Sequence, residues 1–173
     1  DDLFDAVANK KDVSPENAYR FLKASATICG SDDRTAARIF LSPGNHDIYF
    51  NDRDYKIMAS AGVTLLDNAD CSVVIRGQKL RIGGLSSKVD LDWLAAFAAK
   101  DGYKLLLCHH PEYYFKYIKG RYDFDLILSG HVHGGQWRIG GQGIYSPGQG
   151  LFPKYTRGFY EDRLVISAGC ANT

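Results

Sequence analysis

Three short apolar runs in this chain each lead into a polar segment that contains histidine. Runs of this kind are typical of strands that are buried on both faces of a parallel sheet. In open α/β sheets, ligands bind beyond the carboxyl ends of the strands, so three such segments can converge on one site. The sequence therefore predicts an α/β fold with one histidine-rich site. All five histidines fall in the three segments, which are Gly44-Asn45-His46-Asp47, Cys108-His109-His110-Pro111 and Gly130-His131-Val132-His133.

The pair His131 and His133 is the most specific part of this pattern. It follows the apolar run Asp125 to Ser129, which we interpret as a buried parallel strand. On extended backbone, residues two apart point to the same side, so both imidazoles could reach one metal ion or two adjacent ions. A His-x-His pair alone is a weak indication, and the other two histidine segments strengthen it.

Together and in order, the segments resemble the later motifs of the calcineurin-like metallophosphoesterases, whose pattern is D-x-H, GDxxD, GNHD, H-x-P and GHxH. The resemblance runs from about Ser14 to the end of the chain. The tail from Gly150 to Tyr160 is similar to a bacterial subfamily of phosphohydrolases with membrane-linked members. The resemblance implies a four-layer αββα sandwich, here without its first strand or strands. It also implies two divalent metal ions (Mn, Fe or Zn) that share a hydroxide and hydrolyse a phosphate ester or pyrophosphate.

The resemblance assigns metal ligands residue by residue. Asn45, His109 and His131 match the ligands of one ion, and His133 matches a ligand of the other. His109 is chosen over His110 because it occupies the first position of H-x-P. We expect His110 to be a packing residue or a residue just outside the ligand shell.

Two further assignments concern the carboxylates and the acid of the reaction. Asp2, spaced from Asp5 as in GDxxD, matches the carboxylate that bridges the ions, although Asp1 stands where the family has Gly. An acidic chain terminus without a role is the alternative for Asp2. By resemblance His46 faces the substrate and protonates the leaving oxygen, while Asp47 orients its ring.

The segment from Gly134 to Gly158 is rich in glycine, and we expect it to be a loop that forms a wall or lid beside the site. Trp137 is a candidate for the wall of the pocket. Lys154 and Arg157 could bind a second phosphate or an anionic headgroup, and solvated surface charge is the alternative for both.

Length and composition bound the remaining possibilities. The 173 residues predict a single domain. We expect it to be incomplete at the N-terminus, because D-x-H is absent and residue 1 is not Met, and at the C-terminus, because the resembled subfamily continues there with another strand. Net charge is +1, so nucleic acid is not an expected partner. The expected partner is a phosphorylated small molecule or a lipid-linked substrate. No apolar run reaches the ~18 residues that span a bilayer. The chain is therefore expected to be cytoplasmic, or membrane-associated through a missing N-terminal segment.

Two function classes remain open on the sequence. The first is a metal-dependent phosphohydrolase, favoured by the intact His46 and histidine ligands. The second is a non-catalytic binding module, or an inactive truncated form, with the same fold, favoured by the absent D-x-H motif. Cys108 is interpreted as a buried thiol and not as a ligand, because such a dinuclear site prefers oxygen and imidazole donors.

Overall fold

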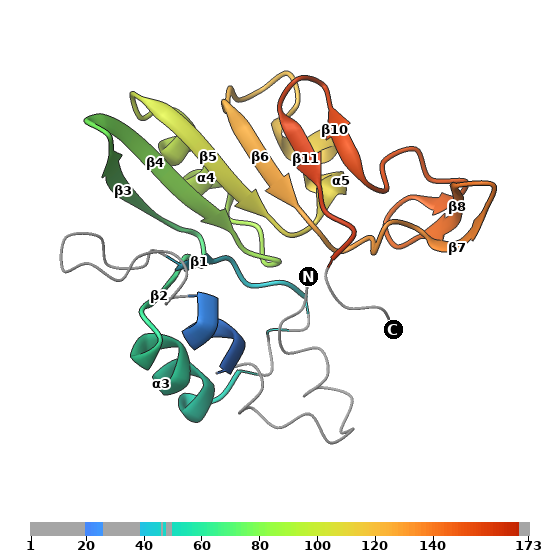
Figure 1. The fold of residues 1–173 in the computed structure, drawn as a ribbon. Helices are drawn as coiled ribbons and strands as arrows, with labels where there is room; N and C mark the ends of the chain where they lie inside the picture. The colour runs from blue at the N-terminus through green and yellow to red at the C-terminus, as the bar shows by residue number, and fades with distance from the viewer. Residues whose placement is uncertain (1–19, 26–38, 46, 48–49, 170–173) are drawn as a thin grey trace.

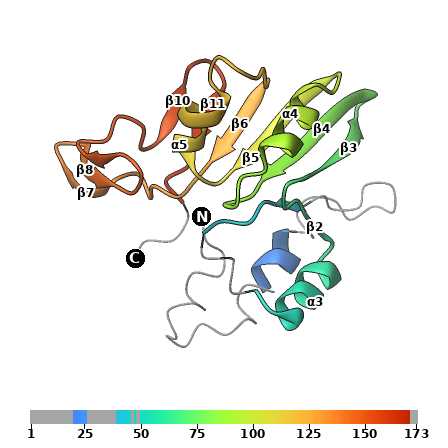
Figure 2. The same cartoon turned by 180° about the vertical axis from the view of Figure 1, so that it is seen from behind.

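The computed structural model describes residues 20–25, 39–45, 47 and 50–169. The predicted site residues Asp2 and His46 lie outside this part of the chain. The prediction of an α/β fold is confirmed: a six-stranded mixed sheet carries helices on one face, as Figure 1 and the view from behind in Figure 2 show.

The large sheet has the strand order β10-β11-β6-β5-β4-β3. Its four central strands run parallel, and the outer strands β3 and β10 pair antiparallel with their neighbours. The bounds of its strands are β3 Ala69–Ile75, β4 Gln78–Leu85, β5 Tyr103–Cys108, β6 Leu126–Ser129, β10 Gly158–Tyr160 and β11 Leu164–Ile166.

Helices connect β4 to β5 and β5 to β6, and they cover one face of the sheet (Figure 2). Helix α4 (Leu91–Ala98) joins β4 to β5, and Asp90 caps it by accepting a 2.9 Å hydrogen bond from the Trp93 amide. The short helix α5 (Pro111–Tyr113) and the π-helical turn η2 (Tyr114–Ile118) join β5 to β6.

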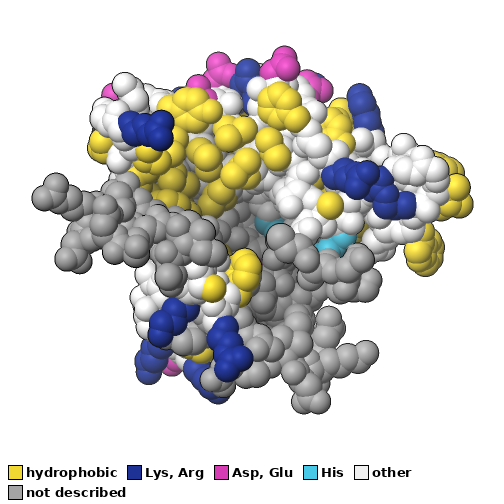
Figure 3. Space-filling view, in the orientation of Figure 1, with side chains coloured by type: hydrophobic (Ala, Val, Ile, Leu, Met, Phe, Trp, Pro, Cys, Tyr) yellow, Lys and Arg dark blue, Asp and Glu magenta, His cyan; other side chains and the backbone are white. Residues whose placement is uncertain are grey.

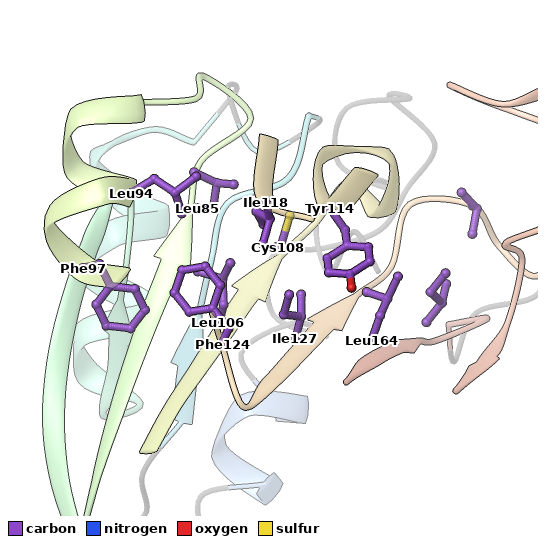
Figure 4. Packing of buried hydrophobic residues seen from close by; sticks show 12 residues of the cluster. Leu85, Leu94, Phe97, Leu106, Cys108, Tyr114, Ile118, Phe124, Ile127 and Leu164 are labelled. Carbon is purple, nitrogen blue, oxygen red and sulfur yellow. The ribbon is translucent and has the colours of Figure 1, made fainter. Parts of the chain in front are cut away.

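The main core lies between this helical layer and the sheet, as Figure 4 shows. Phe97 of α4 is fully buried and stacks between Trp93 and Phe124, at centroid distances of 5.4 and 5.7 Å. Gly83 on β4 leaves the space that the Phe97 ring fills, since a Cβ there would lie 2.5 Å from that ring.

The opposite face of the sheet is also apolar. Alternation along β5 and β6 sends Leu106 and Ile127 to the helical side and a second set of residues to this face. The second set is half-buried, and Figure 3 shows hydrophobic side chains gathered over this part of the surface. Its members on the parallel strands include Leu105, Leu107, Leu126, Leu128 and Val165.

A second group of elements carries the Asn45 segment. Strands β1 (Ile39–Leu41) and β2 (Val63–Leu65) pair in parallel, and helix α3 (Asp52–Ser60) lies between them in the sequence. Residues 20–25 are helical, and Leu22 packs with Met58 of α3 in a small core. A reciprocal pair of hydrogen bonds between Asn51 and Asp54 caps α3.

The hairpin between β3 and β4 turns at Arg76 and Gly77, both at positive φ. One local prediction of the fold differs from the structure. The segment predicted to be a loop forms a small antiparallel sheet of β7 (Gln136–Ile139), β8 (Gln142–Ser146) and β9 (Gly150–Leu151). Among the described residues, no helix has the length and apolar character needed to span a bilayer.

Candidate metal centre

The carboxyl ends of the parallel strands bring the histidine segments together, as predicted. His109 follows β5 directly, and His131 follows β6 by two residues. The Gly130 amide donates to the His109 carbonyl at 3.1 Å, which ties the two segments to each other. The Ser42 hydroxyl, just beyond β1, donates to the Leu85 carbonyl at the end of β4.

The predicted extended backbone at His131 and His133 is wrong. Strand β6 ends at Ser129, and the two histidines have φ of +67° and +48°, so both lie in a tight turn. Val132 between them is fully buried, and its amide donates back to the Gly130 carbonyl. The glycines that flank the pair allow this turn, and the turn, not a strand, sets the direction of each imidazole.

Asn45 and His109 are in direct contact although 64 residues separate them in the sequence. The side-chain oxygen Oδ1 of Asn45 lies 2.9 Å from Nε2 of His109. Two ligands of one metal ion, each about 2.1 Å from it, lie about 3 Å apart when they subtend a right angle at the ion. The two atoms are at hydrogen-bond distance in this structure, and the same separation would allow both to bind one divalent ion.

Gly44 makes this contact sterically feasible. A Cβ at Gly44 would lie 2.8–2.9 Å from three atoms of the His109 ring, closer than real side chains approach. Any residue larger than glycine would therefore force the His109 ring or the loop that carries Asn45 to shift. The GN pair of the GNHD segment thus supplies both the space and the oxygen donor.

Three histidines form the cluster that could hold a metal ion. His109, His110 and His131 each offer a ring nitrogen, and these atoms lie within 4.8 Å of one another. The ring centroids of His109 and His131 are 5.0 Å apart, and those of His110 and His131 are 4.2 Å apart. His133, assigned by resemblance to the second ion, is not a member of this group.

Both ring nitrogens of the buried His110 already have hydrogen-bond partners. Its Nδ1 lies 3.1 Å from Oε1 of Glu112, and its Nε2 lies 3.2 Å from the hydroxyl of Ser87. A carboxylate only accepts hydrogen bonds. Nδ1 of His110 therefore carries a proton and donates a hydrogen bond to Glu112. Although His110 lies in the cluster, ligation through either nitrogen would break one of these bonds. Its geometry fits a residue that packs beside the ligands.

Glu112 is held ionised by this network. Burial raises its pKa, but the hydrogen bond from His110, its own backbone hydrogen bond and the nearby histidines lower it more, so the net pKa lies below the ordinary value. Its second oxygen, Oε2, is buried and has no hydrogen-bond partner in the described part of the chain. Gly148 leaves the space for this carboxylate, since a Cβ there would lie 2.7 Å from its Oε1.

Sequence reasoning missed Ser87 and Glu112. Ser87 comes shortly after the end of β4, so the rule that located the histidines would also have found it. No sequence pattern indicated a role for Glu112, because its distance from His110 depends on the turn that begins α5. Tyr113 completes the arrangement: its hydroxyl donates to the Ser87 carbonyl at 3.0 Å, and its ring stacks on His110.

The other predicted residues lie as follows. Asp47 is buried, and its Oδ2 accepts a 2.6 Å hydrogen bond from the Gly44 amide, which closes the loop around Asn45. A cavity of about 310 Å³ beside Asp47 and His109 opens between β1 and the ends of β5 and β6.

The three predicted substrate-binding residues lie on or after the small sheet and are exposed: Trp137, Lys154 and Arg157. Their substrate-binding roles stay predictions.

Cys108, at the end of β5, is fully buried, and its Sγ donates to the His110 carbonyl. Burial, with the nearby Glu112, raises the pKa of this thiol far above its usual range. The thiol is thus protonated and is not poised to bind a metal ion, which agrees with the interpretation from sequence.

Comparisons with known proteins agree with this geometry. The family model for calcineurin-like phosphoesterases matches residues 2–135. The chain is also 33% identical over 111 residues to a Bacillus subtilis (strain 168) protein described as "Uncharacterized protein YpbG". That alignment covers 61% of this chain and 42% of the relative, so the chain spans less than half of the relative's length. The comparison with solved structures gave no significant match.

The matched range includes the Asn45 loop, the His109 segment and the turn with His131 and His133, and ends before the small sheet. The subfamily indicated by the Gly150–Tyr160 tail therefore remains a prediction. A family model that covers most of the chain, together with the mixed sheet and the histidine cluster at its carboxyl edge, shows that the chain belongs to the calcineurin-like phosphoesterases, hydrolases of phosphoester bonds that use divalent metals.

Proposed function

We propose that this protein is a phosphohydrolase with a dinuclear metal site that cleaves a phosphate ester or pyrophosphate. Asn45, His109 and His131 would hold one divalent ion. His133 would contribute to the second, and the carboxylate of Asp2 would bridge the two ions. Divalent ions at such a site, when bound, polarise a phosphoryl group and activate water.

The contact between Asn45 Oδ1 and His109 Nε2 at 2.9 Å carries this proposal. An oxygen donor and an imidazole nitrogen from distant parts of the chain meet at the distance expected for two ligands of one ion. The centroids of the His131 and His109 rings are 5.0 Å apart, and His131 would supply a third donor. Imidazole and amide oxygen together suit Mn, Fe or Zn.

The remaining residues of the site orient these donors. His110 packs against both His109 and His131 and is fixed by Glu112 and Ser87. Residues that hold metal ligands in place in this way typically change metal affinity or activity by about 10–100-fold when they are mutated. His46 would donate a proton to the leaving oxygen, with Asp47 orienting it; general acid help of this kind is worth about 10²–10⁴-fold.

The test is metal content measured together with hydrolysis. The purified protein is loaded with Mn²⁺, desalted and analysed for metal by mass spectrometry, and hydrolysis of p-nitrophenyl phosphate and bis(p-nitrophenyl) phosphate is followed. We expect two ions per chain and hydrolysis of at least one substrate, both lost in His109→Ala. His46→Ala should keep the metal and lose most of the rate.

The competing function is a binding module without catalysis. It would bind metal, or an intact phosphate ester by calorimetry, with no release of phosphate or nitrophenol. One ion per chain without hydrolysis would contradict the dinuclear proposal. Wild-type turnover in His46→Ala would contradict the assignment of the general acid.

A further inference from the structure

The small sheet β7–β9, with the residues that follow it up to Arg157, projects from the end of the large sheet near β10 and β11 (Figures 1 and 2). We call this part the projecting sheet. It begins at Gln136, directly after the turn that carries His131 and His133. The projecting sheet is thus joined directly to the turn of the candidate metal centre.

Of the large apolar side chains that the projecting sheet exposes, four are at least 70% exposed. Trp137 is 80% exposed, Ile139 73%, Leu151 70% and Phe152 71%. Single exposed apolar residues are ordinary on protein surfaces, but a group of four on one small unit is typical of an interaction site. Figure 3 shows hydrophobic side chains at the outer margin of this unit, with Lys and Arg side chains beside them.

These side chains do not form one flat face. Leu151 ends β9, whereas Phe152 lies beyond it at a φ of +52°, and Trp137 has a φ of +48°, so the backbone turns at two of the four residues and does not present them on one regular strand. Leu151 pairs with Tyr145 across the sheet, whereas the Phe152 amide donates to the Ile144 carbonyl. A protein partner usually covers one face of a sheet. Highly exposed apolar groups on an irregular backbone fit immersion in the interfacial layer of a membrane better.

The charge of this region favours an anionic surface. No Asp or Glu occurs from residue 126 to residue 160, whereas Arg138, Lys154 and Arg157 do. The Arg138 guanidinium donates to the carbonyls of Gly134 and Gly141 and so belongs to the turn itself. Lys154 and Arg157 are exposed at the surface, where each cation close to an anionic bilayer contributes about 1 kcal/mol.

The projecting sheet is fixed to the domain. Tyr155 stacks on Phe115 of η2 with centroids 4.1 Å apart. The Gln149 side chain bridges the amide and the carbonyl of Tyr155, at 3.0 and 2.6 Å. Because of this contact, the orientation of the projecting sheet on a surface would also set the orientation of the histidine turn relative to that surface.

We infer that the projecting sheet docks the protein on the surface of an anionic lipid bilayer, with Trp137, Ile139, Leu151 and Phe152 in the interfacial layer and Lys154 and Arg157 at the headgroups. Aromatic side chains with a polar edge are typical of this layer. Docking would place the carboxyl edge of the large sheet at the membrane surface. The inference does not rest on the proposed function, since it concerns binding without substrate or metal.

The test is co-sedimentation with sucrose-loaded vesicles of phosphatidylcholine, with and without phosphatidylglycerol. We expect binding to the anionic vesicles that weakens with salt. The double variant Leu151→Ser/Phe152→Ser should lose about tenfold in partition coefficient per residue, because each removes a large apolar group from the interface. Lys154→Gln/Arg157→Gln should lose about fivefold per charge on anionic vesicles only.

Val74→Ser/Ile75→Ser is the matched control. These residues are 60% and 51% exposed, and they lie on β3, at the opposite edge of the large sheet from the projecting sheet. The control should bind as the wild type does. Equal binding by the Leu151/Phe152 variant, or no binding by the wild type, would overturn the inference.

A second measurement does not depend on the folding of these variants. In a Trp93→Phe background, Trp137 is the only tryptophan, and its fluorescence should shift to the blue and be quenched by brominated phosphatidylcholine. An unchanged spectrum would overturn the inference. So would sedimentation showing that the wild type self-associates without lipid and that Leu151→Ser/Phe152→Ser is monomeric, since a second copy of the chain would then be the occupant.

Discussion

The side-chain oxygen of Asn45 lies 2.9 Å from Nε2 of His109. The two residues follow the ends of β1 and β5, strands that belong to different sheets. Their contact therefore exists only when the two groups of elements are assembled. The affinity of this pair for a metal ion should therefore depend on the correct assembly of both groups of elements.

Removal of either partner should weaken metal binding. Asn45→Ala removes one oxygen ligand, and His109→Ala removes one nitrogen ligand. We expect each variant to lose Mn²⁺ affinity by at least about tenfold, because mutation of residues that only hold the ligands in place already costs about that much. Titration calorimetry measures the affinity, and circular dichroism confirms that each variant is folded. Gln78→Ala, an exposed change at the start of β4, is the control. Unchanged affinity in both site variants would place the ion elsewhere.

Gly44→Ala tests the space beside the same ring. The added Cβ would lie 2.8 Å from the His109 ring, so the ring or the loop that carries Asn45 must shift. We expect metal affinity to fall about 10–100-fold, as for other changes that displace a ligand. Calorimetry with Mn²⁺ measures this loss.

Gly140→Ala is the control for the replacement itself. Nothing lies within 4 Å of a Cβ at Gly140, whose φ is +56°, so this variant should lose about 1 kcal/mol of stability and keep its metal affinity. Equal affinity in Gly44→Ala and Gly140→Ala would show that the His109 ring has room to adjust.

The central strands and the meeting of the histidine segments were predictable from sequence. Buried parallel strands form continuous apolar runs, and the apolar run that leads into the His109 segment forms β5. Parallel strands end at the same edge, so the rule that places ligands at that edge was enough to bring His109 and His131 together.

Local backbone geometry was not predictable in the same way. The direction of His131 and His133 depends on positive φ at both residues, which histidine adopts uncommonly and which no spacing rule indicates. The small sheet β7–β9 contains little apolar alternation, because Gly140, Gly141 and Gly143 interrupt it. Its pairing comes from turns between short strands and not from a pattern of burial.

The thiol of Cys108 should resist alkylation in the folded protein. Burial raises its pKa, so the reactive thiolate is scarce, and the sulfur is closed to solvent. Brief treatment with iodoacetamide near pH 8, followed by peptide mass spectrometry, should label the half-buried Cys71 well before Cys108. After unfolding in urea, both should react at similar rates. Rapid labelling of native Cys108 would contradict its assignment to the core.

Phe97 should be among the most costly residues to truncate. It is fully buried, and its ring stacks with Trp93 and Phe124. Phe97→Ala should destabilise the protein by about 3–5 kcal/mol through lost burial and the cavity left behind. Phe159→Ala, at an exposed position, should change stability by less than about 0.5 kcal/mol. Urea unfolding of both variants measures the two costs.

The pair Glu112–His110 should make stability depend on pH in acid. The pKa of Glu112 is lowered in the folded protein, so its ionised form stabilises the fold at pH values above its unfolded pKa, about 4.3. This contribution is lost as pH falls through the lower, folded pKa. Glu112→Gln keeps an oxygen that accepts from Nδ1 of His110 but has no charge to titrate. The difference in unfolding free energy between wild type and Glu112→Gln should thus be constant near neutral pH and shrink below about pH 4.

Urea unfolding at a series of pH values measures this difference, and a double-mutant cycle with His110→Gln assigns it to the pair. Asp123→Asn is the matched control, since Asp123 makes an ion pair with Arg163 at the exposed surface, away from the histidine cluster. A difference for Glu112→Gln that stays constant from neutral pH down to about pH 3 would mean that the carboxylate gains nothing from His110. In that case Glu112 would serve only to fill the space beside Gly148, and Ser87 alone would hold the orientation of the His110 ring.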